Sequence, residues 1–330
     1  MKHLHLLIPD LFPPQDIAAE VCAGLHLQAL QKLLARGAAS ASHSVSLEER
    51  LCTDFAAEGV APVRAAADGL DVAGGYWLCA DPVHLQMQHA QVMLWPDLAL
   101  SREEAAALCA NLNEHFAGMG LKFHAPHPQR WYVEMEGTPQ LVTAPLPQVA
   151  WRDAKFHQPH GTDATRWQRI VTEAQMLLHA HPANQARAAR GELAVNSLWL
   201  WGGGRAAELR RPFGAVGGDS ELAGAFADAA GVPQMGTLSA MLDAECETGL
   251  WVCSAPRDAL QRGDLHAWRV EVQRLEQEFA EPLLKALQAG RVQRLVLEVP
   301  QAGGGRRFDL TRGGTWRFWR TRQSLAQYAV

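Results

Sequence analysis

Short apolar runs separated by amphipathic stretches constrain the fold of this chain most strongly. Gly249–Ser254 and Arg294–Val299 are apolar runs of strand length, and Asp264–Gln288 between them repeats apolar residues at helical spacing. Leu4–Ile8 near the N-terminus is a run of the same kind, stopped by a proline and Asp10. Strands that alternate with helices predict an α/β fold with a largely parallel sheet, because right-handed crossovers bring such strands side by side.

Three further stretches extend this pattern. Asp16–Arg36 keeps apolar residues at helical spacing up to Gly37, and Asp163–His181 does so up to Pro182, so each predicts a helix. Leu193–Trp201 is largely apolar and ends at three glycines, which predicts a central strand closed by a tight turn. The same turn could bring backbone N–H groups to a phosphate, although it lacks the Lys-Ser/Thr of a P-loop.

The chain between residues 74 and 149 follows a different pattern. Short apolar runs predict strands there, and Ser101-x-x-Glu104 predicts the capped start of a helix. The strands are expected at Tyr76–Ala80, Gln91–Trp95 and Trp131–Met135, and the helix at Ser101–Gly118. We therefore expect an α+β subdomain at 74–149, inserted into a core formed by residues 1–73 and 150–330.

Charge and cysteine usage limit the classes of partner and compartment. Thirty Lys and Arg against 35 Asp and Glu give a net charge of −5, which argues against nucleic acid or an anionic membrane as a general partner. The six cysteines are scattered without C-x-x-C spacing, and no run reaches the ~18 apolar residues of a membrane span. We expect a cytoplasmic protein with reduced thiols.

One local exception lies near the C-terminus. Arginines between Arg306 and Arg322 interleave with Phe308, Trp316, Phe318 and Trp319, a composition able to stack on or neutralise an anionic partner, so a nucleic-acid-binding module built on this tail is a third and weakest hypothesis. A sheet edge protected by charged side chains has the same composition, so both interpretations stay open.

Acidic, imidazole and guanidinium side chains supply candidate ligand contacts, namely Asp81, His84, Arg130, Arg187 and Arg190. Arg187 and Arg190 lie three residues apart and could form a fork for a phosphate or carboxylate. The competing interpretations are a turn at Asp81 and solvated surface arginines. An anionic metabolite held by these residues would sit between the core and the insert.

Two serines after the first helix, Ser44 and Ser46, are conceivable nucleophiles. No Gly-x-Ser-x-Gly elbow surrounds them, so catalytic residues stay unassigned.

Several ordered motifs resemble those of archaeal-type cofactor-independent phosphoglycerate mutases. His181–Gly204, HPANQARAARGELAVNSLWLWGGG, is similar to the family's His-Pro-x-Asn, Arg, Gly and Ala-Asn before a Trp-Leu-Trp-Gly-x-Gly strand and turn. Lys2–Asp10 resembles its first strand with the first metal-binding Asp, Asn111–Val133 its insert-domain helix and strand, and Val252–Asp264 its late metal-binding loop. The resemblance implies the alkaline phosphatase-like superfamily, with a mostly parallel sheet flanked by helices, an inserted α+β domain, two divalent metals and a serine nucleophile.

The full set of motifs resembles a second family more closely. WLCADPVHL, RWYVEM, EAQMLLHAHP and NSLWLWGGG are similar to motifs of bacterial RpfE-type regulatory proteins, which are themselves phosphoglycerate mutase-like. This resemblance implies a regulatory protein.

The departures from the mutase pattern fall on its metal ligands. The mutases carry Ala-Pro-Asp-Glu-Ala-Gly-His in the late loop, whereas this chain places Arg257 and Gln261 at the carboxylate and imidazole positions. The Asp-His after the next strand becomes Leu297-Glu298-Val299-Pro300, and Pro-Pro-His-Asp becomes Ala144-Pro145-Leu146-Pro147. Arginine has no lone pair to offer a cation, so only Asp10 remains as a vestigial metal ligand.

We therefore expect a degenerate active site in a non-catalytic protein that binds an anionic metabolite or a regulatory protein partner, with no cofactor. The alternative is an active metal-dependent phosphoglycerate mutase or phosphatase with a rearranged site. It would hold Mn or Zn through Asp10, Asp258, Asp264 and Glu298.

Overall fold

Two compact units make up the chain in the computed structural model, which describes residues 1–43 and 46–329. The first, the sheet unit, combines Met1–Ala56 with Leu209–Val330. The second, the inserted unit, spans Ala57–Glu208. Each unit has its own cluster of buried apolar side chains.

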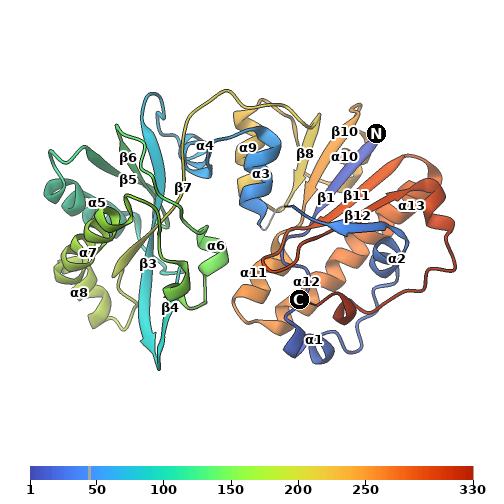
Figure 1. Ribbon diagram of the computed structural model, residues 1–330, viewed down its shortest axis with the longest axis horizontal. Helices are drawn as coiled ribbons and strands as arrows, with labels where there is room; N and C mark the ends of the chain where they lie inside the picture. Colours follow the sequence, from blue (N-terminus) through green and yellow to red (C-terminus); the bar gives the residue numbers. More distant parts are fainter. Residues whose placement is uncertain (44–45, 330) are drawn as a thin grey trace. The chain divides into compact units, whose positions relative to one another are not determined.

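The sheet unit is built on a mostly parallel sheet. Within the described residues it has seven strands in the order β2-β12-β11-β1-β10-β8-β9 (Figure 1). The strands from β11 to β9 run parallel, whereas β12 and β2 are antiparallel additions at one edge. The bounds are β1 His3–Leu7, β2 Ala38–Ala41, β8 Ala215–Gly218, β9 Gln234–Met235, β10 Thr248–Val252, β11 Arg294–Val299 and β12 Arg306–Thr311. The α/β fold class is confirmed.

Helices cover this sheet. They are α1 Gln15–Val21, α2 Gln28–Arg36, α3 Leu47–Phe55, α9 Glu221–Ala229, α10 Leu238–Asp243, α11 Ala255–Gln261, α12 Leu265–Leu275 and α13 Glu281–Ala289. A π-helical turn, Glu276–Ala280, joins α12 to α13, and 3-10 turns lie at Arg312–Trp316 and Leu325–Tyr328. No helix in the described part of the chain combines the length and apolar character needed to cross a bilayer.

The inserted unit has a separate antiparallel sheet. Its strand order is β4-β3-β6-β5, and β7 pairs antiparallel with residues 76–83 of β3. The strands are β3 Tyr76–Gln88, β4 Gln91–Trp95, β5 Leu121–His127, β6 Arg130–Met135 and β7 Ser197–Arg205. The helices are α4 Val60–Ala67, α5 Arg102–His115, α6 Leu146–Val149, α7 Ala164–Ala180 and α8 Pro182–Ala189, with a 3-10 turn at Ala154–His157.

The inserted unit is longer than the predicted subdomain at 74–149. It also includes α4 before that segment and α7, α8 and β7 after it. The reason is the pairing of β7 with β3 and the packing of α4 and α7 on β7, which tie these elements to the antiparallel sheet.

The prediction for Leu193–Trp201 was wrong about the sheet that this strand joins and about the turn expected at the glycines that follow it. The strand pairs antiparallel with β3 instead of joining the parallel sheet, and Gly202–Gly204 continue β7 instead of forming a turn. A Cβ on Gly204 would lie 2.7 Å from the backbone nitrogen of Gly59, which precedes α4. The glycines therefore allow α4 to begin directly against the strand.

The predicted helix Asp16–Arg36 is two helices, α1 and α2. Gly24 between them adopts a φ of +71°, which a continuous helix does not allow. The buried Glu276 carboxylate accepts hydrogen bonds from the N–H groups of Ala29 (2.6 Å) and Leu30 (2.8 Å), and so caps the start of α2. The same residue begins the π-helical turn inside the predicted helix Asp264–Gln288.

Candidate functional site

The candidate site lies at the carboxyl ends of β1, β10 and β11. Asp10 follows β1, Arg257 lies in the helix after β10, and Glu298 is near the end of β11. These strands are parallel neighbours, so their ends meet at one edge of the sheet, where open α/β folds bind ligands. Asp10 has a φ of 47°, and its N–H donates to the Pro300 carbonyl at 3.0 Å.

Arg257 pairs with a buried carboxylate at this edge. Its Nη1 lies 3.0 Å from Oε1 of Glu48, on the first turn of α3, and its Nε lies 3.3 Å from Oδ1 of Asp258. The side chains of Arg257 and Glu48 are only 12% and 4% exposed. Burial lowers the pKa of Arg257, but the carboxylates of Glu48, Asp258 and Asp10 outweigh it and raise that pKa above its usual value.

Glu298 belongs to a second ionic cluster. The Ser42 hydroxyl donates to its Oε1 at 2.6 Å, while Arg50 and Arg307 lie 3.7 and 3.6 Å from its Oε2. Asp54 lies 3.3 Å from Arg50, yet burial raises the pKa of Asp54 to about 6. Arg50 therefore lies near both carboxylates, and Arg307 lies near that of Glu298.

Asp219 after β8 holds the start of α11 in place. Its Oδ1 accepts hydrogen bonds from the backbone N–H of Ser254 at 2.5 Å and from the Ser254 hydroxyl at 2.8 Å. Its Oδ2 accepts one from the N–H of Ala255 at 3.2 Å. The Ser254 hydroxyl is therefore already used in a hydrogen bond at the start of α11, the helix that carries Arg257.

A pair of divalent cations does not fit these residues. Among residues 1–43 and 46–329, no group of three or more His, Cys, Asp or Glu side chains is placed to hold a metal ion. Three of the four carboxylates of the rearranged-site alternative have different partners: Asp258 contacts Arg257, Glu298 contacts Ser42 and two arginines, and Asp264 accepts from Ala267 N–H at the start of α12. Buried acceptors without a hydrogen-bond partner include Glu48 Oε2, on the carboxylate that Arg257 binds, and Glu298 Oε2, which lies 3.6 and 3.7 Å from two arginines.

The structure describes only one of the two conceivable serine nucleophiles. Ser46 is buried and caps α3, where its hydroxyl accepts the N–H of Glu49 at 3.1 Å. Ser44 lies outside the described residues.

The predicted contact Asp81 lies inside the inserted unit and is fully buried. Arg64 of α4 binds it with two hydrogen bonds of 2.5 and 3.0 Å, and the indole of Trp201 and the N–H of Trp131 donate at 2.7 and 3.2 Å. The guanidinium of Arg64 also lies over the rings of Tyr132 and Trp201. Both carboxylate oxygens of Asp81 are therefore satisfied by its own unit.

Arg130 joins the same network at its margin. It donates to both oxygens of Asp68 at 2.8 to 3.1 Å, and the Tyr132 hydroxyl donates to Asp68 at 2.5 Å. Although burial raises the pKa of Asp68, the hydrogen bonds from Arg130 and Tyr132 hold it below its usual value. The Arg130 side chain is 30% exposed.

Arg187 and Arg190 both contact the same two carboxylates, those of Glu104 and Glu192. Glu104 lies 2.8 Å from Arg187 and 2.6 Å from Arg190, and Glu192 contacts both arginines. Arg187 is almost completely buried and also donates to the carbonyls of Leu98, Ala99 and Leu193. Arg190 is half exposed.

His84 stands apart from both networks on β3. Its Nδ1 lies 2.8 Å from the carbonyl oxygen of Ala194. The structure thus brings Asp81 together with Arg130 through Arg64 and Tyr132, and Arg187 together with Arg190.

Sequence reasoning missed Arg64 and Glu48, which organise these networks, and Glu276, which caps α2. Arg64 lies in an alanine-rich helix with no motif around it. Glu48 had one signal, since the Ser46-x-x-Glu49 cap predicts the start of α3 and so places Glu48 on its first turn.

Comparisons with known proteins give partial sequence matches. No family model matches the chain. A probable 2,3-bisphosphoglycerate-independent phosphoglycerate mutase of Geobacter sulfurreducens is 30% identical over 80 residues, 23% of this chain and 20% of that protein. The enzymes of Methanothrix thermoacetophila and Methanosarcina mazei are 28% and 23% identical over 112 and 155 residues, 34% and 45% of this chain and 28% and 38% of theirs. The matches therefore span less than half of the length of these curated relatives, and they indicate a distant relation.

Solved structures match over nearly the whole chain. The PH0037 protein from Pyrococcus horikoshii aligns with a TM-score of 0.58 and 12% identity, covering 94% of this chain and 87% of that one. Cofactor-independent phosphoglycerate mutase from Thermoplasma acidophilum aligns with a TM-score of 0.51 and 14% identity, covering 99% and 94%. At such low identity these likenesses show a common fold.

Proposed function

We propose that this distant relative of the cofactor-independent phosphoglycerate mutases works by binding an anionic metabolite or a regulatory protein partner, without phosphoryl transfer. The observation that carries the proposal is the pair between Arg257 and Glu48 at the carboxyl edge of the sheet. Similarity to the mutases supports the phosphate-handling ancestry, and the motifs that resemble RpfE-type proteins support a regulatory role. A fold shared with enzymes does not by itself bring their chemistry.

A fixed guanidinium opposes a divalent cation at the same edge. At about 4 Å and an effective dielectric constant of about 20, a divalent cation and a guanidinium repel by on the order of 8 kcal/mol. A cation bound at the other oxygen of Glu48 would lie beside the guanidinium that Oε1 already binds. Without cations, no clamp acts on the two oxygens of an in-line displacement.

The exposed arginines of the inserted unit are the best candidates for ligand contact. Arg130 and Arg190 reach solvent, whereas Asp81 and Arg187 are buried and support them through their networks. An anionic ligand at Arg130 would compete with Asp68, and one at Arg190 with Glu104 and Glu192. Guanidinium groups bind carboxylate and phosphate alike.

Metal content and turnover test the proposal directly. The purified full chain is incubated with Mn or Zn, its bound metal is measured by elemental analysis, and 3-phosphoglycerate is offered as substrate with and without EDTA. We expect substoichiometric metal and no conversion, while calorimetric titration with 3-phosphoglycerate reports binding separately. Stoichiometric metal together with turnover that EDTA abolishes would establish the rearranged-site enzyme instead.

A matched variant tests whether Arg257 is the barrier to metal. Arg257→Asp combined with Gln261→His restores the ligand types of the mutase loop. This variant is expected to bind more Mn than the unaltered chain. Equal and negligible Mn in both proteins would show that Arg257 alone does not exclude the metal.

A further inference from the structure

Residues 312–322 form a cationic, aromatic segment that the proposed function does not use. The segment contains four arginines and no acidic residue, in a chain whose net charge is −5. Three of its rings are strongly exposed: Trp316 at 66%, Phe318 at 81% and Trp319 at 67%. Exposed rings that alternate with arginines are unusual on a surface where they bind nothing.

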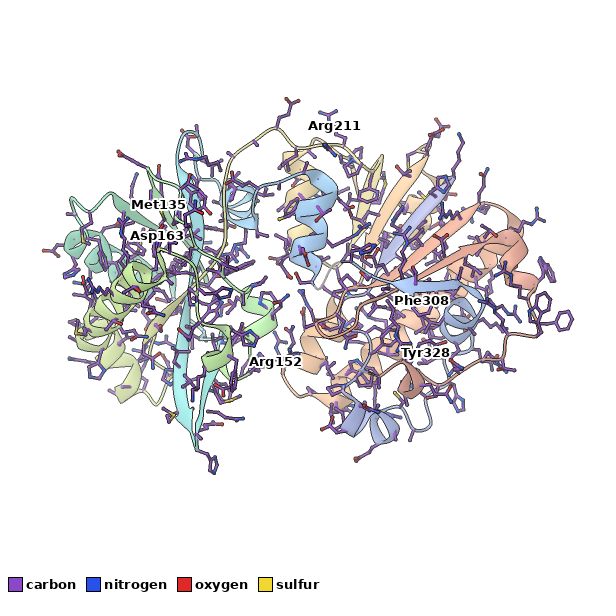
Figure 2. All side chains as sticks on the ribbon, in the orientation of Figure 1. Met135, Arg152, Asp163, Arg211, Phe308 and Tyr328 are labelled. Atoms are coloured by element: carbon purple, nitrogen blue, oxygen red, sulfur yellow. The ribbon has the colours of Figure 1, made fainter. Side chains whose placement is uncertain are left out.

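The segment is held on the sheet unit at both ends. The Arg36 guanidinium donates to the carbonyl of buried Thr315, and Arg320 donates to the carbonyl of Gly37 at 2.7 Å. Further along, the ring of Tyr328 stacks on Phe12 at 5.4 Å between centroids and lies edge-on to Phe308, close to it in Figure 2. The rings are therefore presented from a fixed support, which lowers the entropy cost of binding.

An arginine groove lies beside this segment. The groove has a volume of about 490 Å³, and its charged lining residues are Arg36, Arg294, Arg317 and Asp309. Arg294 holds Asp309 with hydrogen bonds of 2.5 and 2.6 Å. Arg317 belongs to both the groove and the segment, and within the described residues Arg312, Arg317 and Arg322 form no ion pair with a carboxylate. The groove and the segment thus make one continuous cationic surface.

We propose that this surface binds single-stranded nucleic acid, with its phosphates along the arginine groove and its bases stacked on Trp316, Phe318 and Trp319. Unpaired bases offer faces that exposed rings can stack on, and a strand's phosphates follow a cationic groove. The proposal concerns a different end of the sheet from the candidate site: the groove lies at the start of β11 and the end of β12, whereas Glu298 lies at the opposite end of β11.

Two other anionic partners fit the surface less well. A lipid bilayer is flat and would touch the exposed rings, but the three groove arginines line a concavity that a flat surface does not enter. An acidic peptide would satisfy the arginines but has no need of three neighbouring exposed rings. A nucleic acid strand uses both features.

Fluorescence anisotropy with a labelled 12-residue oligothymidylate tests the proposal on the full chain. We expect binding at 50 mM salt that weakens by roughly 20- to 50-fold at 200 mM, the dependence expected for three to four phosphate contacts on a single strand. Replacing Trp316, Phe318 and Trp319 together by Ala should weaken binding at least tenfold, since each stacked base contributes ~1–3 kcal/mol. Stacking should also quench tryptophan fluorescence in the unaltered chain.

Matched variants elsewhere on the surface control for exposure and charge. Phe156→Ala removes a ring that is 81% exposed, like Phe318, and Arg166→Ala with Arg169→Ala removes two exposed charges from α7. Both should leave binding unchanged. Absence of binding at low salt, equal loss in the control variants, or tighter binding to phosphatidylserine vesicles or polyglutamate than to the oligonucleotide would each overturn the proposal.

Discussion

Arg257 places a buried positive charge at the carboxyl edge of the parallel sheet. It neutralises Glu48 and contacts Asp258, and only 12% of its side chain is exposed. Burying this ion pair costs the desolvation free energy of both charged groups. Removing either partner therefore leaves the other charge buried and uncompensated.

Arg257→Met should therefore destabilise the sheet unit strongly, by ~3–5 kcal/mol, because it leaves the Glu48 carboxylate buried without its partner. The double variant Glu48→Gln with Arg257→Met should recover most of that loss, because it removes both charges. Urea unfolding followed by circular dichroism measures the free energies of unfolding for the double-mutant cycle.

The exposed pair of Lys285 and Glu281 is the control for this cycle. These side chains are 3.9 Å apart and 78% and 48% exposed, so Lys285→Met should leave stability essentially unchanged. A similar loss from Lys285→Met and Arg257→Met would contradict the buried-pair argument.

Among the elements, α4 and β7 show a contact that depends on glycine. A Cβ on Gly59 would overlap the carbonyl oxygen of Gly203, although the φ of Gly59, −164°, suits any residue. The requirement at this position is for space alone, where the start of α4 meets the strand.

Gly59→Ala should destabilise the inserted unit by about 1–3 kcal/mol, because the added methyl group forces α4 away from β7. Thermal unfolding monitored by tryptophan fluorescence measures the effect. Gly137→Ala in the same unit is the control, since a Cβ there meets nothing within 4 Å, and it should keep or slightly raise the stability. Equal shifts in both variants would exclude the steric explanation.

The sequence predicts elements well where local rules decide them. The strands Gln91–Trp95 and Arg294–Val299 have the expected bounds, and the predicted capping box of Ser101 and Glu104 is present at α5. Strand partners depend on contacts distant in sequence, so the apolar run before the glycines did not reveal that β7 pairs with β3. The carboxylate that caps the start of α2 belongs to Glu276, about 250 residues later in the chain.

The candidate site shows the same division between local and distant information. The placement of Asp10 at the end of β1 follows from one short run and a turn. The partners of Asp81, Arg187 and Arg257 come from other elements, so periodicity and spacing did not identify them.

At the scale of the whole molecule, each unit has a core of its own. Trp131 and Trp167 are buried in the inserted unit, and Trp268 is buried in the sheet unit. Within the sheet unit, Arg210 N–H donates to the Phe55 carbonyl at 2.8 Å, so the two segments that flank the insertion meet. Gly59 and Gly204, near the two ends of the inserted unit, also lie close together, since a Cβ on Gly204 would come within 2.7 Å of the Gly59 nitrogen.

Residues 57–208 should therefore fold as an isolated fragment, with cooperative thermal unfolding and a near-ultraviolet circular dichroism signal from the buried tryptophans. A shorter fragment, residues 57–196, lacks β7 and with it Leu198 and Leu200 of the core, and should not fold cooperatively. Loss of cooperativity in the longer fragment as well would mean that the inserted unit needs the rest of the chain.

The meeting of Phe55 with Arg210 has an evolutionary consequence. Recombination could lengthen, shorten or exchange residues 57–208 without changing the order of any strand in the parallel sheet. Chains that share the sheet unit are then free to carry other domains at this junction.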